Sequence, residues 1–301
     1  MVERYIDFLG LNQTIDLLNA NERPLTPSIR INTLKVSIEA LKERLEKKSF
    51  KLASLKWIPY GFNILNQPQN LGSLHEFLQG YYYLQNVASM FPAHILNPKP
   101  NDVVIDMCAA PGSKATQLAQ IMNNKGTLIL IDKNLNRIPA LEINLRRMGI
   151  FNSMILNYDS INLERLNIRA DKILLDVPCT GEGLIRQDKS RKLSKSINDI
   201  NKMASIQKKL LKAGLSVLKP GGKLVYSTCS IAPEEDELVV NSVLQNNPQC
   251  KIENLKFQYG LNGFTKIYGK NLMKDLSKSQ RFFPHIHDTI GFYICLLKKE
   301  N

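Results

Sequence analysis

The chain has 301 residues, and its 40 lysines and arginines against 27 aspartates and glutamates give a formal net charge of +13. Hydrophobic residues make up 44% and charged residues 22% of the sequence, and these globular values exclude disorder, collagen and coiled coil as descriptions of the whole chain. The apolar runs are far shorter than the roughly 20 residues of a membrane helix, so we expect no membrane association.

The first residues, the cysteines and the net charge indicate the compartment and the partner. The segment Met1-Val2-Glu3-Arg4-Tyr5 carries mixed charge and no apolar core, so we expect no secretory signal. Five sparse cysteines fit reduced thiols and a cytoplasmic protein better than a disulfide framework. The positive excess indicates a polyanionic partner, most often nucleic acid, although a lysine-rich surface that only aids solubility is the alternative.

The first 75 residues are predicted to form a small α+β unit. Alternating apolar residues indicate strands, and Ser37 stands where a helix N-cap is expected. In chain order we predict a strand at 28–36, a helix at 38–48, short strands within 52–65 broken by Pro59-Tyr60-Gly61, and a helix from 77 to 96 that ends at Asn97-Pro98.

From residue 102 short buried strands alternate with helices. This pattern predicts a mostly parallel sheet with helices on both faces, and we divide the chain into 1–75 and a catalytic domain at 76–301. The predicted strands are 103–107, 126–132, 153–158, 172–177, 222–227, 250–256 and 291–298, and the predicted helices are 113–122, 137–148, 200–218 and 234–245.

Ligands of such sheets bind at the carboxyl ends of the strands, and the first such end is the loop 106–114. The loop lacks the GxGxxG spacing of nicotinamide and flavin sites. Its small residues permit close backbone approach, and the helix near Ser113 offers N–H groups to an anionic group such as a carboxylate. The next strand ends at Asp132, where an acid can accept hydrogen bonds from ribose hydroxyls, and Asp159 follows the third strand, suitably placed for an adenine amino group. Each aspartate could instead be an ordinary helix cap.

Two cysteines follow the next two strands, in the loops Asp176-Val177-Pro178-Cys179 and Ser227-Thr228-Cys229-Ser230. Cysteines at neighbouring strand ends face one crevice. There is no Cys-x-x-Cys to indicate a redox pair, and the four histidines show no ligand spacing, so we expect no metal. Cys250 and Cys295 lie in predicted strands and are expected in the core.

Basic residues are concentrated between Leu184 and Lys223, where eleven stand against two acids. By contrast, the helix predicted at 38–48 mixes lysines with glutamates and is interpreted as a solvated face. The segment 184–223 is therefore the predicted contact with a phosphate backbone.

The loop 106–114 and the two cysteine loops resemble the motifs of the NOL1/NOP2/Sun family of S-adenosylmethionine-dependent RNA cytosine-C5 methyltransferases. Further matches extend from 79–86 to 289–293. The resemblance implies a Rossmann-like methyltransferase domain and S-adenosylmethionine as cofactor. RNA rather than DNA is implied as the partner, because DNA cytosine-C5 methyltransferases carry their nucleophile in the Pro-Cys loop and lack the Thr-Cys loop. The compact length is similar to that of archaeal-type tRNA enzymes, so we expect tRNA first and rRNA second, and a monomer.

The resemblance also implies roles for individual residues. Cys229 matches the nucleophile that adds to carbon 6 of cytosine, and Cys179 matches the residue that assists breakdown of the adduct. Asp176 is expected at the N3 and amino edge of the base, and Lys114 adds positive charge there or simply pairs with Asp176. The implied cofactor contacts are Cys108, Ala109, Ala110, Pro111, Gly112, Ser113, Lys114, Asp132, Arg137, Asp159 and Asp176.

Three points keep alternatives open. The family commonly has a proline after the basic stretch at 186–192, which this chain lacks, and this puts the geometry of its RNA loop in doubt. The unit at 1–75 is expected either to contact RNA or to serve only packing. An RNA-binding or assembly factor without turnover is the second function class, and methylation of an exocyclic amine is disfavoured because that chemistry favours an Asn/Asp-Pro-Pro-aromatic loop.

Overall fold

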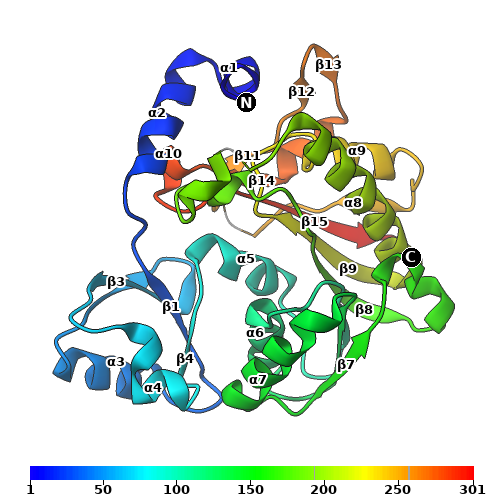
Figure 1. The fold of residues 1–301 in the computed structure, drawn as a ribbon. Coiled ribbons are helices and arrows are strands. Elements are labelled where there is room, and N and C mark those ends of the chain that lie inside the picture. The colour runs from blue at the N-terminus through cyan, green and yellow to red at the C-terminus, as the bar shows by residue number, and fades with distance from the viewer. Residues whose placement is uncertain (193, 257) are drawn as a thin grey trace. The chain divides into compact units, whose positions relative to one another are not determined.

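The structure is a computed structural model that describes residues 1–192, 194–256 and 258–301 (Figure 1). The chain packs into two compact units. The middle unit is Thr26–Ser160, and the split unit combines Met1–Leu25 with Ile161–Asn301. The division expected at residue 75 stays a prediction.

The middle unit begins with an antiparallel sheet in the order β2-β3-β1-β4. Helix α3 buries Leu41 and Leu45 in its core, and the Ser37 hydroxyl accepts from the Ala40 N–H as the predicted N-cap. The elements are β1 (Ser28–Ile31), α3 (Ile38–Lys47), β2 (Lys51–Leu55), β3 (Ile58–Asn66), the 3₁₀ turn Leu71–Ser73, α4 (His75–Leu78), β4 (Tyr82–Leu84) and α5 (Val87–Leu96).

The helix predicted from 77 to 96 is wrong as a single element. The chain forms α4, turns at Gly80 and runs extended as β4, which pairs with β1 before α5 begins. Gly80 has a φ of +73°, and a Cβ there would lie 1.8 Å from the carbonyl oxygen of Arg147. Only glycine meets both conditions, so the turn divides the apolar run into three elements.

The predicted break at Pro59-Tyr60-Gly61 is also wrong, because β3 runs through it. The ladder between β2 and β3 shifts register in this stretch, between Ser54 and Leu55, so Pro59 is accommodated beside an irregularity rather than in a regular ladder. The turn lies before it, at Lys56 and Trp57.

The rest of the middle unit contains three parallel strands, β5 (Val103–Asp106), β6 (Thr127–Asp132) and β7 (Ser153–Asn157). Helix α6 (Ser113–Ile121) connects β5 to β6, and α7 (Ile138–Met148), preceded by the 3₁₀ turn Leu135–Arg137, connects β6 to β7. The buried Arg30 of β1 donates to Thr116 Oγ1 at 2.7 Å and to Gln120 Oε1 at 3.2 Å, so the antiparallel sheet is tied to α6.

The split unit is built on β8 (Ala170–Asp176) and β9 (Leu218–Thr228), which pair in parallel. Strand β15 (Phe292–Lys299) pairs antiparallel with β9 and continues to β14 (Gln280–Phe282) and β11 (Leu261–Asn262). The remaining elements are the 3₁₀ segments Ser160–Leu166 (which begins at the last residue of the middle unit), Glu182–Leu184, Lys189–Lys192 and Lys274–Lys278, the helices α8 (Ile197–Val217), α9 (Glu237–Leu244) and α10 (Pro284–His287), and the strands β10 (Cys250–Ile252), β12 (Lys266–Ile267) and β13 (Lys270–Asn271).

Two helices at the N-terminus were not predicted, α1 (Val2–Leu9) and α2 (Leu11–Glu22). Helix α2 packs against α10 (Figure 1). Tyr5 and Leu17 join Ile231 and Phe283 in a small buried cluster, so these two side chains serve tertiary packing. Among the described residues, none of the helices has the length and apolar character of a membrane span.

Replacing Gly80 should test the turn that divides α4 from β4. Gly80→Ala should lower the thermal unfolding midpoint more than Gly269→Ala. Both glycines have a φ near +74°, which costs an alanine about 1–2 kcal/mol, but only at Gly80 would a Cβ also meet backbone, since nothing lies within 4 Å of it at Gly269. Circular dichroism on heating measures both, and equal midpoints would contradict the close approach to Arg147.

Candidate active site

The loop between β5 and α6 is fixed by its backbone. The Ala109 N–H donates to the Ile131 carbonyl at 2.8 Å, which joins the loop to the end of β6. Gly112 has a φ of +105°, and a Cβ there would lie 3.0 Å from Leu141 Cδ1. Helix α6 follows with Gly112 as its N-cap, and no side chain of the described residues caps its first N–H groups. Those groups are therefore available to an anion.

The aspartate at the end of β6 is buried and directed at the same loop. Asp132 Oδ2 accepts from the Ala110 N–H at 3.2 Å, and Oδ1 accepts from the Asn134 N–H at 2.9 Å. Arg137 pairs with Asp132 at 3.2 Å and also donates to the Ala110 carbonyl oxygen. The predicted residues Ala110, Asp132 and Arg137 thus form one connected group within the middle unit.

The other predicted residues of the middle unit lie around this loop. Lys114, in the first turn of α6, donates to Ser89 Oγ on α5 at 2.9 Å. Cys108 is half-buried, and its N–H donates to Asp106 Oδ1 at 3.3 Å. Asp159 is half-buried after β7, next to Ser160, whose hydroxyl donates to the Met107 carbonyl at 2.6 Å.

The two cysteine loops meet within the split unit. Because β8 and β9 are parallel and Asp176 is in register with Ser227, both loops leave the same edge of the sheet. The Sγ atoms of Cys179 and Cys229 lie 3.0 Å apart, and neither cysteine forms a disulfide. The Ser227 hydroxyl donates to Asp176 Oδ1 at 2.7 Å. The sequence predicted that the two cysteines face one crevice, and the structure brings their sulfur atoms into contact.

A hydrogen bond couples the thiols of Cys179 and Cys229. The hydrogen bond with Cys229, together with burial, raises the pKa of the Cys179 thiol well above its usual value. A protonated Cys179 can donate its S–H to the Cys229 sulfur. Cys250 and Cys295 are buried in β10 and β15, as predicted for core residues.

A glycine lets the loops approach this closely. The Gly183 N–H donates to the Cys229 carbonyl at 3.0 Å, and the Gly183 carbonyl accepts from the Gly291 N–H at 2.8 Å. A Cβ at Gly183 would lie 2.2 Å from the Gly291 carbonyl oxygen. Three loops of the split unit therefore pack backbone to backbone at this point.

Arg4 of α1 contacts acidic residues that follow both cysteine loops, and no sequence pattern indicated these contacts. Arg4 forms a salt bridge with Glu182, three residues after Cys179, and a second one of 3.3 Å with Glu234, five residues after Cys229. Burial raises the pKa of Glu182, and the adjacent Arg4 opposes this shift. Because the partners lie more than 170 residues from Arg4, no local pattern could have revealed them.

Some residues of the basic segment have partners within the protein, and others do not. Arg186 is buried and donates to the carbonyls of Arg23 and Pro24, and Lys189 and Lys192 both pair with Glu22. Lys202, Lys209 and Lys212 of α8 are exposed and form no ion pair among the described residues. They lie on one helix face, because they are spaced seven and three residues apart. Part of the predicted phosphate-binding charge is therefore already paired within the protein, at its surface for Lys189 and Lys192.

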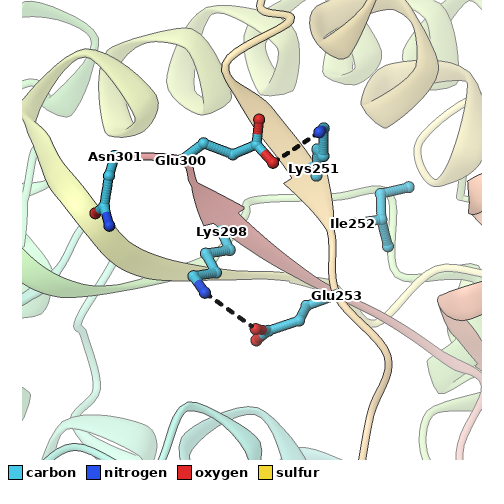
Figure 2. A pocket seen from close by; sticks show the side chains of 6 residues that line it. All are labelled: Lys251, Ile252, Glu253, Lys298, Glu300 and Asn301. Carbon is cyan, nitrogen blue, oxygen red and sulfur yellow. Dashed lines mark ion pairs between the residues drawn. The ribbon is translucent and has the colours of Figure 1, made fainter.

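A hollow of about 270 Å³ lies elsewhere, between β10 and the end of β15 (Figure 2). Lys251 pairs with Glu300 at 2.7 Å, and Lys298 approaches Glu253 at 3.9 Å. None of its lining residues is a predicted site residue. Among the residues that the structure describes, no group of histidine, cysteine and acidic side chains is arranged to hold a metal ion.

Comparison with known proteins defines first the class and then the family. Solved structures with the same fold are a methyltransferase homolog protein from Pyrococcus horikoshii (TM-score 0.90, 39% identity, 99% of this chain and 93% of that chain covered) and NSun6 from Pyrococcus horikoshii with SFG (TM-score 0.87, 28% identity, 100% and 97% covered). The predicted Rossmann-like methyltransferase fold with a mostly parallel sheet and an N-terminal domain is confirmed. The model of the family described as 16S rRNA methyltransferase RsmB/F matches residues 93–298, and that of the N-terminal domain of 16S rRNA methyltransferase RsmF matches residues 1–87. The chain belongs to the RsmB/F family of methyltransferases.

Two curated relatives have different substrates in their names. The chain is 38% identical over 279 residues to the tRNA (cytosine(49)-C(5))-methyltransferase of Pyrococcus abyssi, covering 92% of this chain and 89% of the relative. It is 34% identical over 305 residues to the 25S rRNA (cytosine-C(5))-methyltransferase nop2 of Schizosaccharomyces pombe, covering 99% of this chain and 50% of the relative. The chain spans half or less of that protein and of the relatives from Mus musculus, Homo sapiens and Caenorhabditis elegans. S-adenosylmethionine is the cofactor of the family, and SFG is an analogue of it.

The thiol pair should be visible in alkylation by iodoacetamide. In Cys229→Ala, the midpoint of the pH profile for Cys179 should move to lower pH, because the hydrogen bond that raises its pKa is removed. Mass spectrometry of the Cys179 peptide measures the profile. Cys250 in the same protein is the control, and it should not shift. An unchanged Cys179 midpoint would contradict the coupling, whereas greater access alone would raise only the plateau.

Proposed function

We propose that this protein is an RNA cytosine-C5 methyltransferase that acts through a covalent bond between Cys229 and carbon 6 of the base. The observation that carries the proposal is the contact between the Cys179 and Cys229 sulfur atoms at the ends of two adjacent parallel strands. Full-length similarity to a named tRNA (cytosine(49)-C(5))-methyltransferase supports it.

The two thiols have different tasks in this proposal. Carbon 5 of cytosine is a weak nucleophile, and addition of the Cys229 thiolate to carbon 6 makes it electron-rich. After transfer of the methyl group, the proton on carbon 5 passes to solvent, its electron pair forms the double bond between carbons 5 and 6, and the bond to Cys229 breaks so that the thiolate leaves. The raised pKa of Cys179 supports an S–H that donates to Cys229 at rest and assists this release.

Asp176 and Lys114 are proposed to act on the polar edge of the base. A protonated Asp176 carboxyl can donate to N3 of the cytosine and stabilise the charge that develops when carbon 6 is attacked. The Ser227 hydroxyl donates to Asp176 Oδ1 at 2.7 Å and thereby orients the carboxyl group. Lys114 is proposed to add positive charge at the same edge.

The middle unit is proposed to hold S-adenosylmethionine, which supplies the transferable methyl group when bound. The residues present fit that cofactor. The α6 N-terminus has no side-chain cap and can receive the carboxylate of the amino-acid part. Asp132 accepts three donors from the protein, and a carboxylate has about four acceptor positions, so it retains capacity for a ribose hydroxyl. The proposed contacts remain Cys108, Ala109, Ala110, Pro111, Gly112, Ser113, Lys114, Asp132, Arg137, Asp159 and Asp176.

We further propose tRNA as the substrate, with the enzyme acting as a cytoplasmic monomer. The tRNA assignment is supported by the Pyrococcus abyssi relative, because this chain covers 89% of it, against 50% of the rRNA enzyme from Schizosaccharomyces pombe. Bisulfite sequencing of total RNA from cells with and without the gene tests it. A 5-methylcytosine lost from rRNA alone would reject tRNA as the substrate. Unchanged cytosine methylation together with RNA binding by the protein would favour an assembly factor.

Substitution of the two thiols should separate their tasks. Cys229→Ala should abolish methyl transfer, because no adduct forms at carbon 6, and Cys179→Ala should accumulate a protein–RNA adduct that resists denaturing electrophoresis. Labelled RNA with S-adenosylmethionine is the assay, and the double variant is the control that should show no adduct. An adduct with Cys229→Ala and none with Cys179→Ala would reverse the assignment.

The exposed face of α8 should carry phosphate contacts. Changing Lys202, Lys209 and Lys212 together to glutamine should weaken RNA binding and lower the slope of log K against log salt by about 2–3, at about 0.7–0.9 per phosphate contact. Filter binding at several salt concentrations measures the slope. The matched control changes Lys42, Lys47 and Lys251, which already pair with Glu46, Glu43 and Glu300. Equal slopes for both triple variants would remove α8 from the interface.

A further inference from the structure

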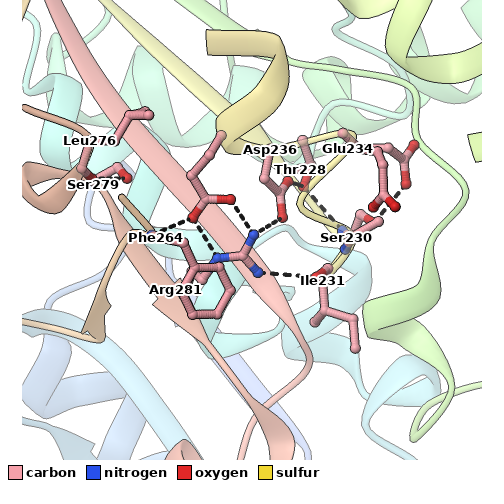
Figure 3. Close-up of polar contacts among 12 residues, drawn as sticks. Thr228, Ser230, Ile231, Glu234, Asp236, Phe264, Leu276, Ser279 and Arg281 are labelled. Carbon is pink, nitrogen blue, oxygen red and sulfur yellow. Dashed lines mark hydrogen bonds and ion pairs between the residues drawn. The ribbon is translucent and has the colours of Figure 1, made fainter. Parts of the chain in front are cut away.

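Of the four consecutive acids at 234–237, the last three are fully buried: Glu235 and Asp236 precede α9, and Glu237 is its first residue. Two of them share a cation, since Arg281 pairs with Asp236 at 3.2 Å and also with Glu237 (Figure 3). Glu235 has no ion pair among the residues that the structure describes. Its charge is balanced by hydrogen bonds alone, and this makes it the unusual member of the three.

The Glu235 carboxylate accepts four hydrogen bonds. Oε1 accepts from the Thr180 N–H at 2.9 Å and from Gln207 Nε2 at 3.0 Å, and Oε2 accepts from the Thr180 hydroxyl at 2.5 Å and the Ser230 hydroxyl at 2.6 Å. An ionised carboxylate has about four acceptor positions, so all of them are filled. The backbone carbonyl of Glu235 also accepts from the Tyr226 hydroxyl at 2.6 Å, and this fixes where the carboxylate begins.

The donors come from the two cysteine loops. Thr180 directly follows Cys179, and Ser230 directly follows Cys229. Gln207 of α8 also donates to the carbonyl of Pro178, the residue before Cys179. One carboxylate therefore joins the chain beside both sulfur atoms, and it does so without touching either of them.

We propose that Glu235 is a positioning residue that sets the distance between the Cys179 and Cys229 thiols. The inference rests on the proposed function for its catalytic meaning, but the spacing itself is a property of the protein alone. A carboxylate is needed because it only accepts. In one orientation, the amide group of a glutamine would place its N–H donors against the Thr180 N–H and the Gln207 amide, which are donors themselves. In the other orientation, it would face the two hydroxyl groups, which would then have to accept instead of donate.

Disulfide formation in the full-length protein without RNA measures the spacing directly. On treatment with diamide, the two thiols lose two protons and two electrons as the S–S bond forms, and diamide is reduced to the hydrazine. Mass spectrometry follows the cross-linked Cys179–Cys229 peptides. In Glu235→Gln the rate should fall on the order of 10- to 100-fold, as expected when reacting atoms are displaced by about 1 Å.

Glu237→Gln is the matched control, because Glu237 is equally buried yet bonds to Arg281 and the Phe264 N–H rather than to a cysteine loop. It should leave the oxidation rate unchanged even where it lowers the unfolding midpoint. Thr180→Val and Ser230→Ala each remove one hydroxyl donor to Glu235. They should also slow oxidation, and they provide the test if Glu235→Gln does not fold.

Methyl transfer supplies the second readout. Glu235→Gln should lower kcat with KM for RNA retained, because the thiols and not the RNA contacts are displaced. Folded Glu235→Gln that oxidises at the wild-type rate, or Thr180→Val and Ser230→Ala that both do so, would overturn the inference. Slow oxidation of Glu235→Gln, together with a wild-type protein that does not methylate RNA, would instead reject the proposed function and leave the positioning role standing.

Discussion

The parallel pairing of β8 with β9 is the constraint on which the candidate site depends. Because Asp176 and Ser227 are in register, the chain leaves both strands at one edge, and the following residues bring two sulfur atoms to 3.0 Å. A shift of one residue in this register would turn every side chain of the shifted strand to the opposite face of the sheet. The contact between the two thiols therefore depends on the register of β8 and β9.

Holding two thiols in contact also requires polar groups in a place where water is excluded. Burial of an isolated carboxylate is costly, and the split unit buries three in a row. Arg281 offsets the charge of two, and burial nevertheless raises the pKa of Asp236 well above its usual value (Figure 3). Glu235 is stabilised by oriented donors instead. The three acids are therefore not a solvated run of charge. The free energy that their burial costs is consistent with a structural role, namely holding the chain around the two thiols rigid.

Sequence patterns predicted the elements whose periodicity is local and missed contacts between distant residues. The parallel strands and the helices between them followed from short apolar runs, and the facing of Cys179 and Cys229 followed from sheet topology. The turn at Gly80 depends on a carbonyl at residue 147, and Arg4 acts on acids more than 170 residues away. Nor did three adjacent acids signal burial, because such a run is ordinarily exposed. These features depend on tertiary neighbours that one sequence does not display.

The net charge of +13 has a different meaning once the partners of the basic segment are known. Lys189 and Lys192 share Glu22 of α2, and Arg186 donates to the chain just after that helix, so these cations attach the N-terminal helices to the segment after the Pro-Cys loop. Because Glu22 cancels one of the two lysine charges, this part of the segment attracts a polyanion less strongly at long range than unpaired cations would. Lys202, Lys209 and Lys212 of α8 are exposed and form no ion pair among the described residues. Attachment of the N-terminal helices and the phosphate contact that we propose for α8 therefore involve different basic residues of one segment.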